Sequence, residues 1–245
     1  MNGSRTTSLD LRGPGRLLLS VLVASLLLYG CRSDLSTSAP STPIPSTPQV
    51  SDENGPQAGD HLSAAQAALE QGNLAVAEAE FRAAVEQDPQ SAEARFALGN
   101  VLIRSGNLQE AEGAYLASLK LDPEQAAAHA NLGVVYYLQG EMAKAAASFE
   151  QALRINEGDA STLYLLAAVR LQENDLAAAE TLLNKALQAD PALPETYYGF
   201  GVLYRLKGQK AEAIEAFEKF LEIGPGQDAS AMDYARRELE ALQAE

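Results

Sequence analysis

Small and apolar side chains recur along this chain with a fixed spacing of 34 residues. Residues 92–125 read AEARFALGNVLIRSGNLQEAEGAYLASLKLDPEQ, and residues 126–159 read AAAHANLGVVYYLQGEMAKAAASFEQALRINEGD, so the two segments align without a gap. The aligned residues include Leu98-Gly99 with Leu132-Gly133, Gly106 with Gly140, Ala111 with Ala145, and Tyr115 with Phe149. A period of this length indicates a stacked array of repeats.

The same spacing continues on both sides of these two segments. Residues 58–91 carry Gly72, Ala77, Phe81, Ala84 and Pro89 at the matching positions. Residues 160–193 carry Ala179, Ala186 and Pro191, and residues 194–227 carry Gly201, Tyr204, Gly208, Ala213, Phe217 and Pro225. The sequence therefore predicts five contiguous repeats over residues 58–227, with no insertion.

Each repeat is expected to form two antiparallel helices. In the second repeat, Ala111, Tyr115 and Ser118 recur at the i, i+4 and i+7 spacing of one helix face. Because no pair buries its apolar face alone, stacking of the pairs must provide the core. The predicted fold class is all-α.

Glycine and proline mark where these helices meet, turn and end. Gly99 should let the second helix of its repeat approach closely, and Gly106 should permit the turn because it tolerates positive φ. Asp122 precedes Pro123, and a residue before proline is pushed out of the helical region, so the second helix should end there.

These residues resemble the tetratricopeptide repeat (TPR) family, whose pattern places Leu-Gly, Tyr, Gly, Ala, an aromatic residue, Ala and Pro at fixed offsets. The resemblance implies a TPR solenoid of five 34-residue helix-turn-helix repeats and a C-terminal capping helix. The expected repeats are 58–91, 92–125, 126–159, 160–193 and 194–227, with the capping helix in 228–245. In the first repeat Ala65 and Ala68 replace the usual Gly and Tyr, as expected of a terminal repeat.

Residues 228–245 are similar to the helix that caps most TPR arrays. Met232, Ala235, Leu239 and Leu242 form an apolar stripe, while Asp233, Arg236, Arg237 and Glu240 face away from it. An amphipathic helix that binds a partner is the alternative interpretation.

The fourth repeat departs most from the family pattern and is the expected soft point of the array. It has Ala167 for Gly, Arg170 for Tyr, Asn174 for the turn Gly and Leu183 for the aromatic residue. Asn174 can still adopt positive φ. Arg170 is expected to lay its stem over the core and to release its charged head to solvent.

Residues 1–30 are expected to be a signal peptide of the bacterial lipoprotein type. An arginine-containing segment precedes an apolar run at residues 17–29, and these 13 residues are shorter than the about 20 that a membrane span needs. The run ends in Leu28-Tyr29-Gly30-Cys31, which resembles a lipobox and implies that Cys31 is lipidated and becomes the mature N-terminus. An uncleaved N-terminal anchor and an incidental thiol are the alternatives.

Residues 31–57 are expected to be a disordered tether behind the lipidated cysteine. They are rich in Ser, Thr and Pro, with few large apolar side chains to offset the ordering entropy. Arg32 follows the cysteine where Asp would retain an enteric lipoprotein in the inner membrane. We therefore expect a lipid-anchored protein of the bacterial cell envelope on the periplasmic or extracytoplasmic face, in the outer membrane if the organism has one.

The chain has 245 residues and a formal net charge of −15. From residue 58 onward there are 29 Asp and Glu against 14 Lys and Arg, so the acidic excess lies on the repeats. Such a surface repels phosphate backbones, so nucleic acid is not an expected partner. We interpret the acidity as a solvated surface, with an acidic binding patch as the alternative.

The sequence offers no pattern typical of a metal site or an active site. Cys31 is the only cysteine, so no intrachain disulfide is expected. His61 and His129 are 68 residues apart and have no partners at ligand spacing. Without a Ser/His/Asp set or a Gly-rich phosphate loop, we expect neither an enzyme nor a cofactor.

In TPR proteins the first helices of successive repeats line a concave groove. The resemblance assigns these residues to a protein-binding groove: Phe96, Asn100, Asn131, Val134, Tyr137, Tyr164, Ala168, Leu171, Tyr198, Val202 and Arg205. The cationic clamp of chaperone-adaptor TPRs is missing, since its positions hold Leu62, Gln66, Ala127 and Asn131. We expect Tyr137, Tyr164 and Tyr198 to be exposed to an extended peptide, the alternative being that they pack between repeats.

The sequence favours a membrane-anchored scaffold for protein–protein interaction that binds a partner protein or peptide in this groove. Envelope TPR lipoproteins of similar layout suggest pilus assembly, adaptors of peptidoglycan enzymes and outer-membrane assembly as settings. The alternative is a structural TPR protein that associates with itself and has no external peptide ligand. The oligomeric state is left open.

Overall fold

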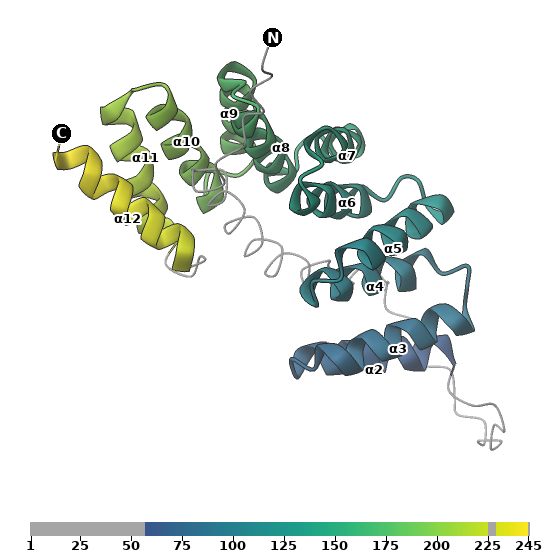
Figure 1. Cartoon of the computed structure of the whole chain (residues 1–245). Coiled ribbons are helices and arrows are strands. Elements are labelled where there is room, and N and C mark those ends of the chain that lie inside the picture. Colours follow the sequence, from purple (N-terminus) through teal and green to yellow (C-terminus); the bar gives the residue numbers. More distant parts are fainter. Residues whose placement is uncertain (1–56, 225–228, 245) are drawn as a thin grey trace, which may run out of the picture. The chain divides into compact units, whose positions relative to one another are not determined.

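The computed structural model describes residues 57–224 and 229–244, and within them it contains eleven α-helices and no strand (Figure 1). The helices are α2 (Ala58–Glu70), α3 (Leu74–Gln87), α4 (Ala92–Arg104), α5 (Leu108–Leu121), α6 (Ala126–Gln139), α7 (Met142–Ile155), α8 (Ala160–Gln172), α9 (Leu176–Ala189), α10 (Pro194–Leu206), α11 (Lys210–Ile223) and α12 (Ala229–Ala244). The first helices of the five pairs begin 34 residues apart, so the predicted all-α repeat fold is confirmed.

The contacts group these helices into two compact units that divide inside α6. The described part of one unit runs from residue 57 to residue 135 and holds α2 to α5 and the first part of α6. That of the other runs over residues 136–224 and 229–244 and holds the rest of α6 and α7 to α12. We call them the 57–135 unit and the 136–244 unit.

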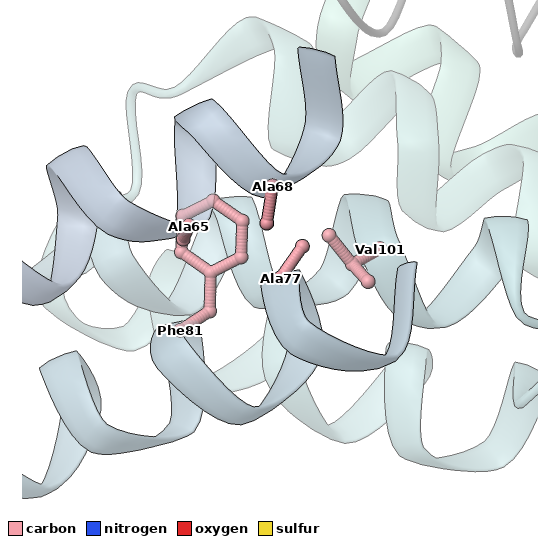
Figure 2. Close-up of a cluster of buried hydrophobic side chains, with 5 residues drawn as sticks. All are labelled: Ala65, Ala68, Ala77, Phe81 and Val101. Carbon is pink, nitrogen blue, oxygen red and sulfur yellow. The ribbon is translucent and has the colours of Figure 1, made fainter. Parts of the chain in front are cut away.

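In the 57–135 unit, α2 pairs with α3, α4 pairs with α5, and α3 also packs on α4. One buried cluster joins three of these helices: Ala65 and Ala68 of α2, Ala77 and Phe81 of α3, and Val101 of α4. Figure 2 shows the Phe81 ring extending from α3 toward Ala65, with Val101 beside Ala77. The small residues of α2 therefore make room for the aromatic ring.

Glycine makes the close approach within a helix pair possible, as predicted for Gly99. A Cβ atom added at Gly99 of α4 would lie 2.6 Å from Cε1 of Tyr115 on α5. The equivalent contact in the other unit joins Gly201 of α10 to the Phe217 ring of α11, at 2.5 Å. Non-bonded carbon atoms do not approach so closely, so a side chain at either glycine must displace the aromatic ring or move the paired helices apart.

The turn inside a repeat requires positive φ. Four of the described turns place a glycine there, namely Gly72, Gly106, Gly140 and Gly208. The fourth repeat places Asn174 there, at φ 59°, which confirms the prediction for this residue. An Asn side chain tolerates this region better than other non-glycine residues.

The second helices of the first four repeats end in an extended residue, whereas Gly224 after α11 has φ −110° and ψ 40°. Asp122 has φ −132° and ψ 92°, as predicted for a residue that precedes Pro123. Asn156 has nearly the same angles, φ −131° and ψ 88°, although Glu157 follows it. Proline is therefore not required for this helix end.

In the 136–244 unit, α8 pairs with α9 and α10 with α11, while α7 contacts α8, and α10 contacts both α8 and α9. The last helix, α12, packs on α11. Its apolar stripe is buried at Met232, Ala235 and Leu242 and half-buried at Leu239. The predicted capping helix is thus confirmed, with Tyr234 as a further buried residue that the stripe did not include.

In the fourth repeat, residues that differ from the family pattern still fill the core positions. Ala167 and Leu183 are fully buried. The guanidinium of Arg170 forms ion pairs with Glu150, at 2.8 Å, and with Glu173, at 2.7 Å. The side chain is 25% exposed and its charged head pairs with two acids, which agrees with the expected placement of the head at the surface.

The predicted signal peptide at residues 1–30 and Cys31 lie outside the described residues, as does the tether apart from Gln57. Among the residues that the structure does describe, no helix is both long enough and apolar enough to cross a bilayer.

Candidate protein-binding site

Four of the predicted groove residues belong to the 57–135 unit. Phe96 and Asn100 lie on α4, and Asn131 and Val134 lie on α6. Phe96 and the two asparagines are half-buried, whereas Val134 is fully buried. The first three can therefore contact a partner, but Val134 belongs to the core.

A hydrogen-bond network joins the two asparagines. Oδ1 of Asn100 accepts from the Tyr115 hydroxyl, at 2.7 Å, and from Nδ2 of Asn131, at 2.8 Å. The Phe96 ring lies 5.9 Å from the Tyr115 ring, centroid to centroid. Burial raises the pKa of Tyr115 well above its ordinary value, so its hydroxyl remains a donor at neutral pH. The network thus fixes the orientation of both amides.

The fixed amides keep unused hydrogen-bonding capacity. Each asparagine side chain has a carbonyl acceptor and an amino donor group. The described residues provide no partner for the amino group of Asn100 or for the carbonyl oxygen of Asn131. A donor and an acceptor on neighbouring first helices match the carbonyl and N–H groups of an extended peptide.

Sequence analysis did not identify Tyr115 as part of this site. The aligned position holds Phe81, Phe149, Leu183 and Phe217 in the other repeats. A hydroxyl at an otherwise apolar position was the available signal, because a buried tyrosine hydroxyl needs a polar partner.

The expectation that Tyr137, Tyr164 and Tyr198 are exposed is wrong. In the 136–244 unit the exposed fractions of these side chains are 1%, 1% and 0%. Their neighbours on the same helix faces are buried as well, namely Ala168, Leu171 and Val202. These residues form packing between helices, and any binding role for them stays an untested prediction.

Tyr164 packs against Gly199 on the next first helix, beside Leu183. A Cβ atom added at Gly199 of α10 would lie 3.4 Å from Cε2 of Tyr164 and 2.6 Å from Cδ2 of Leu183. Gly199 therefore leaves the space that Leu183 fills, and Tyr164 makes an ordinary contact beside it. Burial, reinforced by Tyr198 and Glu195, raises the pKa of Tyr164 far above its ordinary value.

The side chains of Tyr198 and Arg205 contact the capping helix, α12. The Tyr198 ring lies 5.9 Å from Tyr234 of α12 and 5.3 Å from Phe220 of α11. Nε of Arg205 lies 3.1 Å from a carboxylate oxygen of Glu238 on α12. Helix α12 thus covers the part of α10 that sequence analysis assigned to a groove.

Tyr137 is held by its neighbour α8, where Gln172 donates a hydrogen bond to the Tyr137 hydroxyl. Burial raises the pKa of Tyr137 above its ordinary value. Of the predicted groove residues, those with accessible surface are Phe96, Asn100, Asn131 and Arg205.

The two histidines make local contacts. Nδ1 of His61 lies 2.7 Å from a carboxylate oxygen of Glu80, and Nε2 of His129 lies 3.0 Å from the carbonyl oxygen of Pro123. Within the described ranges no group of three His, Cys, Asp or Glu side chains is placed to hold a metal ion.

The repeats match models of known families. Tetratricopeptide repeat models match residues 62–125, 97–160, 136–198 and 194–226, which together span more than half of the chain. The chain therefore belongs to the tetratricopeptide repeat family. A search of curated protein sequences found no match.

Solved structures share the fold at low sequence identity. MamA from Desulfovibrio magneticus RS-1, from residue 41 to its end, is 23% identical, with a TM-score of 0.63 over 71% of this chain and 99% of that chain. YrrB, a TPR protein with an unusual peptide-binding site, is 23% identical, with a TM-score of 0.57 over 74% of this chain and 92% of that chain. PilF of Pseudomonas aeruginosa is 22% identical, with a TM-score of 0.63 over 76% of this chain and 89% of that chain.

Proposed function

We propose that this protein is a membrane-anchored scaffold of the bacterial cell envelope that binds an extended segment of a partner protein across Asn100 and Asn131. The TPR fold itself indicates a scaffold for protein–protein interaction with protein or peptide partners. The anchor, the location and the binding site are the proposed parts.

The asparagine network carries the binding site. Asn100 and Asn131 are held by each other and by Tyr115, so a peptide meets them without a further loss of side-chain entropy. Phe96 provides apolar surface beside them. Polar groups that are fixed before binding, next to an aromatic ring, are typical of sites that recognise a peptide backbone.

The anchor rests on the N-terminal sequence. The apolar run at residues 17–29 and the Leu28-Tyr29-Gly30-Cys31 segment support lipidation of Cys31. A lipidated Cys31 would hold the repeats at a membrane surface of the envelope. Pilus assembly, adaptors of peptidoglycan enzymes and outer-membrane assembly are the candidate settings.

Purification of the native protein from envelope extract, followed by mass spectrometry, would identify its partner, and peptides from that partner then test the site. Asn131→Ala should weaken peptide binding by about five- to tenfold, since it removes one or two hydrogen bonds. It leaves the Tyr115–Asn100 bond in place. Gln188→Ala, which changes an exposed amide on α9, is the matched control and should bind as wild type does. Equal affinity of Asn131→Ala and wild type would overturn the proposed site.

The anchor has its own test. The wild-type protein expressed in bacteria should label with palmitate and partition into detergent, and Cys31→Ala should do neither. A Cys31→Ala variant that still labels would contradict lipidation at this cysteine. Light scattering of the purified protein distinguishes this function from the alternative of a structural protein that only associates with itself. Such a protein would form oligomers and bind no peptide.

A further inference from the structure

A surface cleft of about 740 Å³ lies between α9, α10 and α11 in the 136–244 unit. Its volume is within the range of small-ligand sites, about 300–1,000 Å³. Neither the predicted groove nor the asparagine site uses it. The residues that decide its chemistry are Tyr197, Phe200, Tyr204, Glu212, Glu215 and Glu218.

Aromatic rings of α10 form the base of the cleft. The rings of Phe200 and Tyr204 are stacked, with centroids 5.6 Å apart and an angle of 15° between their planes. Nζ of Lys207 lies 5.9 Å from the Tyr204 ring centroid. This distance is within reach of a cation–π contact, so Tyr204 already attracts one cation of the chain itself.

Carboxylates of α11 form the rim. The lining holds four glutamates against one lysine, Lys219, whose ammonium group lies 2.9 Å from Glu222. Glu212 accepts a hydrogen bond from Gln209, at 2.8 Å. Glu215 and Glu218 form no hydrogen bond or ion pair with the residues that the structure describes. Two exposed carboxylates in the lining therefore have no partner among the described residues.

We propose that the cleft between α9, α10 and α11 binds an arginine side chain from a basic segment of a partner protein. A planar guanidinium can stack on the accessible part of the Tyr204 ring, which Phe200 backs, while its N–H groups donate to Glu215 and Glu218. Lysine fits less well, because an ammonium group cannot stack or bind two carboxylates in one plane. Nucleic acid and anionic lipid are disfavoured by the negative rim.

The cleft and the asparagine site are lined by different helices, so binding at one can be tested without the other. This proposal rests on the proposed scaffold function in one respect, namely that the occupant belongs to a protein. The electrostatic potential around the Tyr204 ring favours a bound cation. Burial raises the pKa of Tyr204 and Glu180 raises it further, Lys207 opposes this, and Glu212 and Glu215 add smaller increases.

The test measures binding of fluorescent peptides to the full-length protein in detergent by fluorescence anisotropy. The probes are an Arg-Gly-Ser repeat peptide and matched peptides that replace Arg with Lys or with citrulline, its neutral analogue. The arginine peptide should bind most tightly, the citrulline peptide at least about tenfold more weakly, and added salt should weaken binding. Equal binding of the arginine and citrulline peptides would overturn the proposal.

Paired variants locate the binding. The double variant Glu215→Gln/Glu218→Gln should lower the affinity for the arginine peptide by about tenfold or more. Glu70→Gln/Glu86→Gln, which removes the same charge from exposed positions of the 57–135 unit, should lower it by less than about twofold. Equal losses in the two double variants would mean that net charge alone attracts the peptide, and the proposal would fail.

A loss of arginine-peptide binding in Asn131→Ala, with none in Glu215→Gln/Glu218→Gln, would place the peptide at the asparagine site. That result overturns the cleft while it supports the proposed function. Displacement of the peptide by an equal concentration of spermidine would mean that the cleft accepts free cations rather than a protein segment, which also overturns the proposal. Circular dichroism of each variant verifies that the helices are retained.

Discussion

Phe96 and Tyr164 occupy the same position in their repeats, the fifth residue of the first helix, and yet their surroundings differ. Phe96, in the 57–135 unit, is half-buried beside the asparagine network. Tyr164, in the 136–244 unit, is 1% exposed and packs where Gly199 has no side chain. One repeat position therefore supplies a candidate binding surface in one unit and core in the other.

The two positions also differ in the residue that the next repeat places beside them. Gly199 is the sixth residue of its repeat, and the residue that aligns with it in the third repeat is Asn131. Glycine leaves space for an aromatic ring to pack against the helix. Asparagine occupies that space with a polar amide, which bonds to Asn100 and keeps the face half-buried.

The largest expected effect is the loss of the buried ring. Tyr164→Ala should lower the free energy of unfolding by about 3–5 kcal/mol, because it leaves a cavity between α8 and α10. Phe96→Ala should lower it by only about 1 kcal/mol, because part of that ring is already in water. Urea titration followed by circular dichroism measures both values. Similar losses in the two variants would mean that the two positions do not differ in burial.

The second prediction places asparagine at Gly199, the position that aligns with Asn131. Gly199→Asn should cost about 1–3 kcal/mol, since its Cβ atom would lie 2.6 Å from Leu183 and must displace this side chain or Tyr164. Gly113 of α5 is the control, because a Cβ atom there has no neighbour within 4 Å. Gly113→Ala should stabilise the protein by about 0.5–1 kcal/mol. Thermal melts report both changes. An unchanged melting temperature for Gly199→Asn would show that the packing at Gly199 leaves room for a side chain.

A smaller effect is expected at the turns, which both units share. Asn174→Ala should cost about 1 kcal/mol, because alanine is strained at φ 59°. Asn174→Gly should be tolerated, since glycine holds this position in the other described turns with positive φ. Chemical denaturation of the two variants checks the difference. A larger loss with glycine than with alanine would show that the Asn174 side chain, not its backbone, matters.

The smallest effect is expected on the outer face of the capping helix. Arg236 is exposed and lies 3.2 Å from Asp233, also exposed. Arg236→Ala should change the free energy of unfolding by no more than about 0.5 kcal/mol. A differential scanning calorimetry measurement that found a large loss would mean that α12 packs through both of its faces.

The helix pairs could be predicted from the sequence because local rules fix them. Gly99 and Gly201 mark the close approach of paired helices, and Gly106 or Asn174 supplies positive φ at the turn. These requirements lie within 34 residues, so each repeat contains the information for its own helices. The apolar stripe of α12 was predictable for the same reason, since its period is that of one helix.

The sequence by itself therefore determined the class of fold, the 34-residue period and the residues that bring paired helices together. It also located Asn100 and Asn131 on the faces of their helices, although not the Tyr115 hydroxyl that holds them. Exposure was decided only by the tertiary structure, because it depends on what a neighbouring repeat or α12 places opposite a residue. Tyr164 and Leu183 pack against Gly199, Tyr198 packs against Tyr234 of the capping helix, and side chains of three helices line the cleft that includes Phe200.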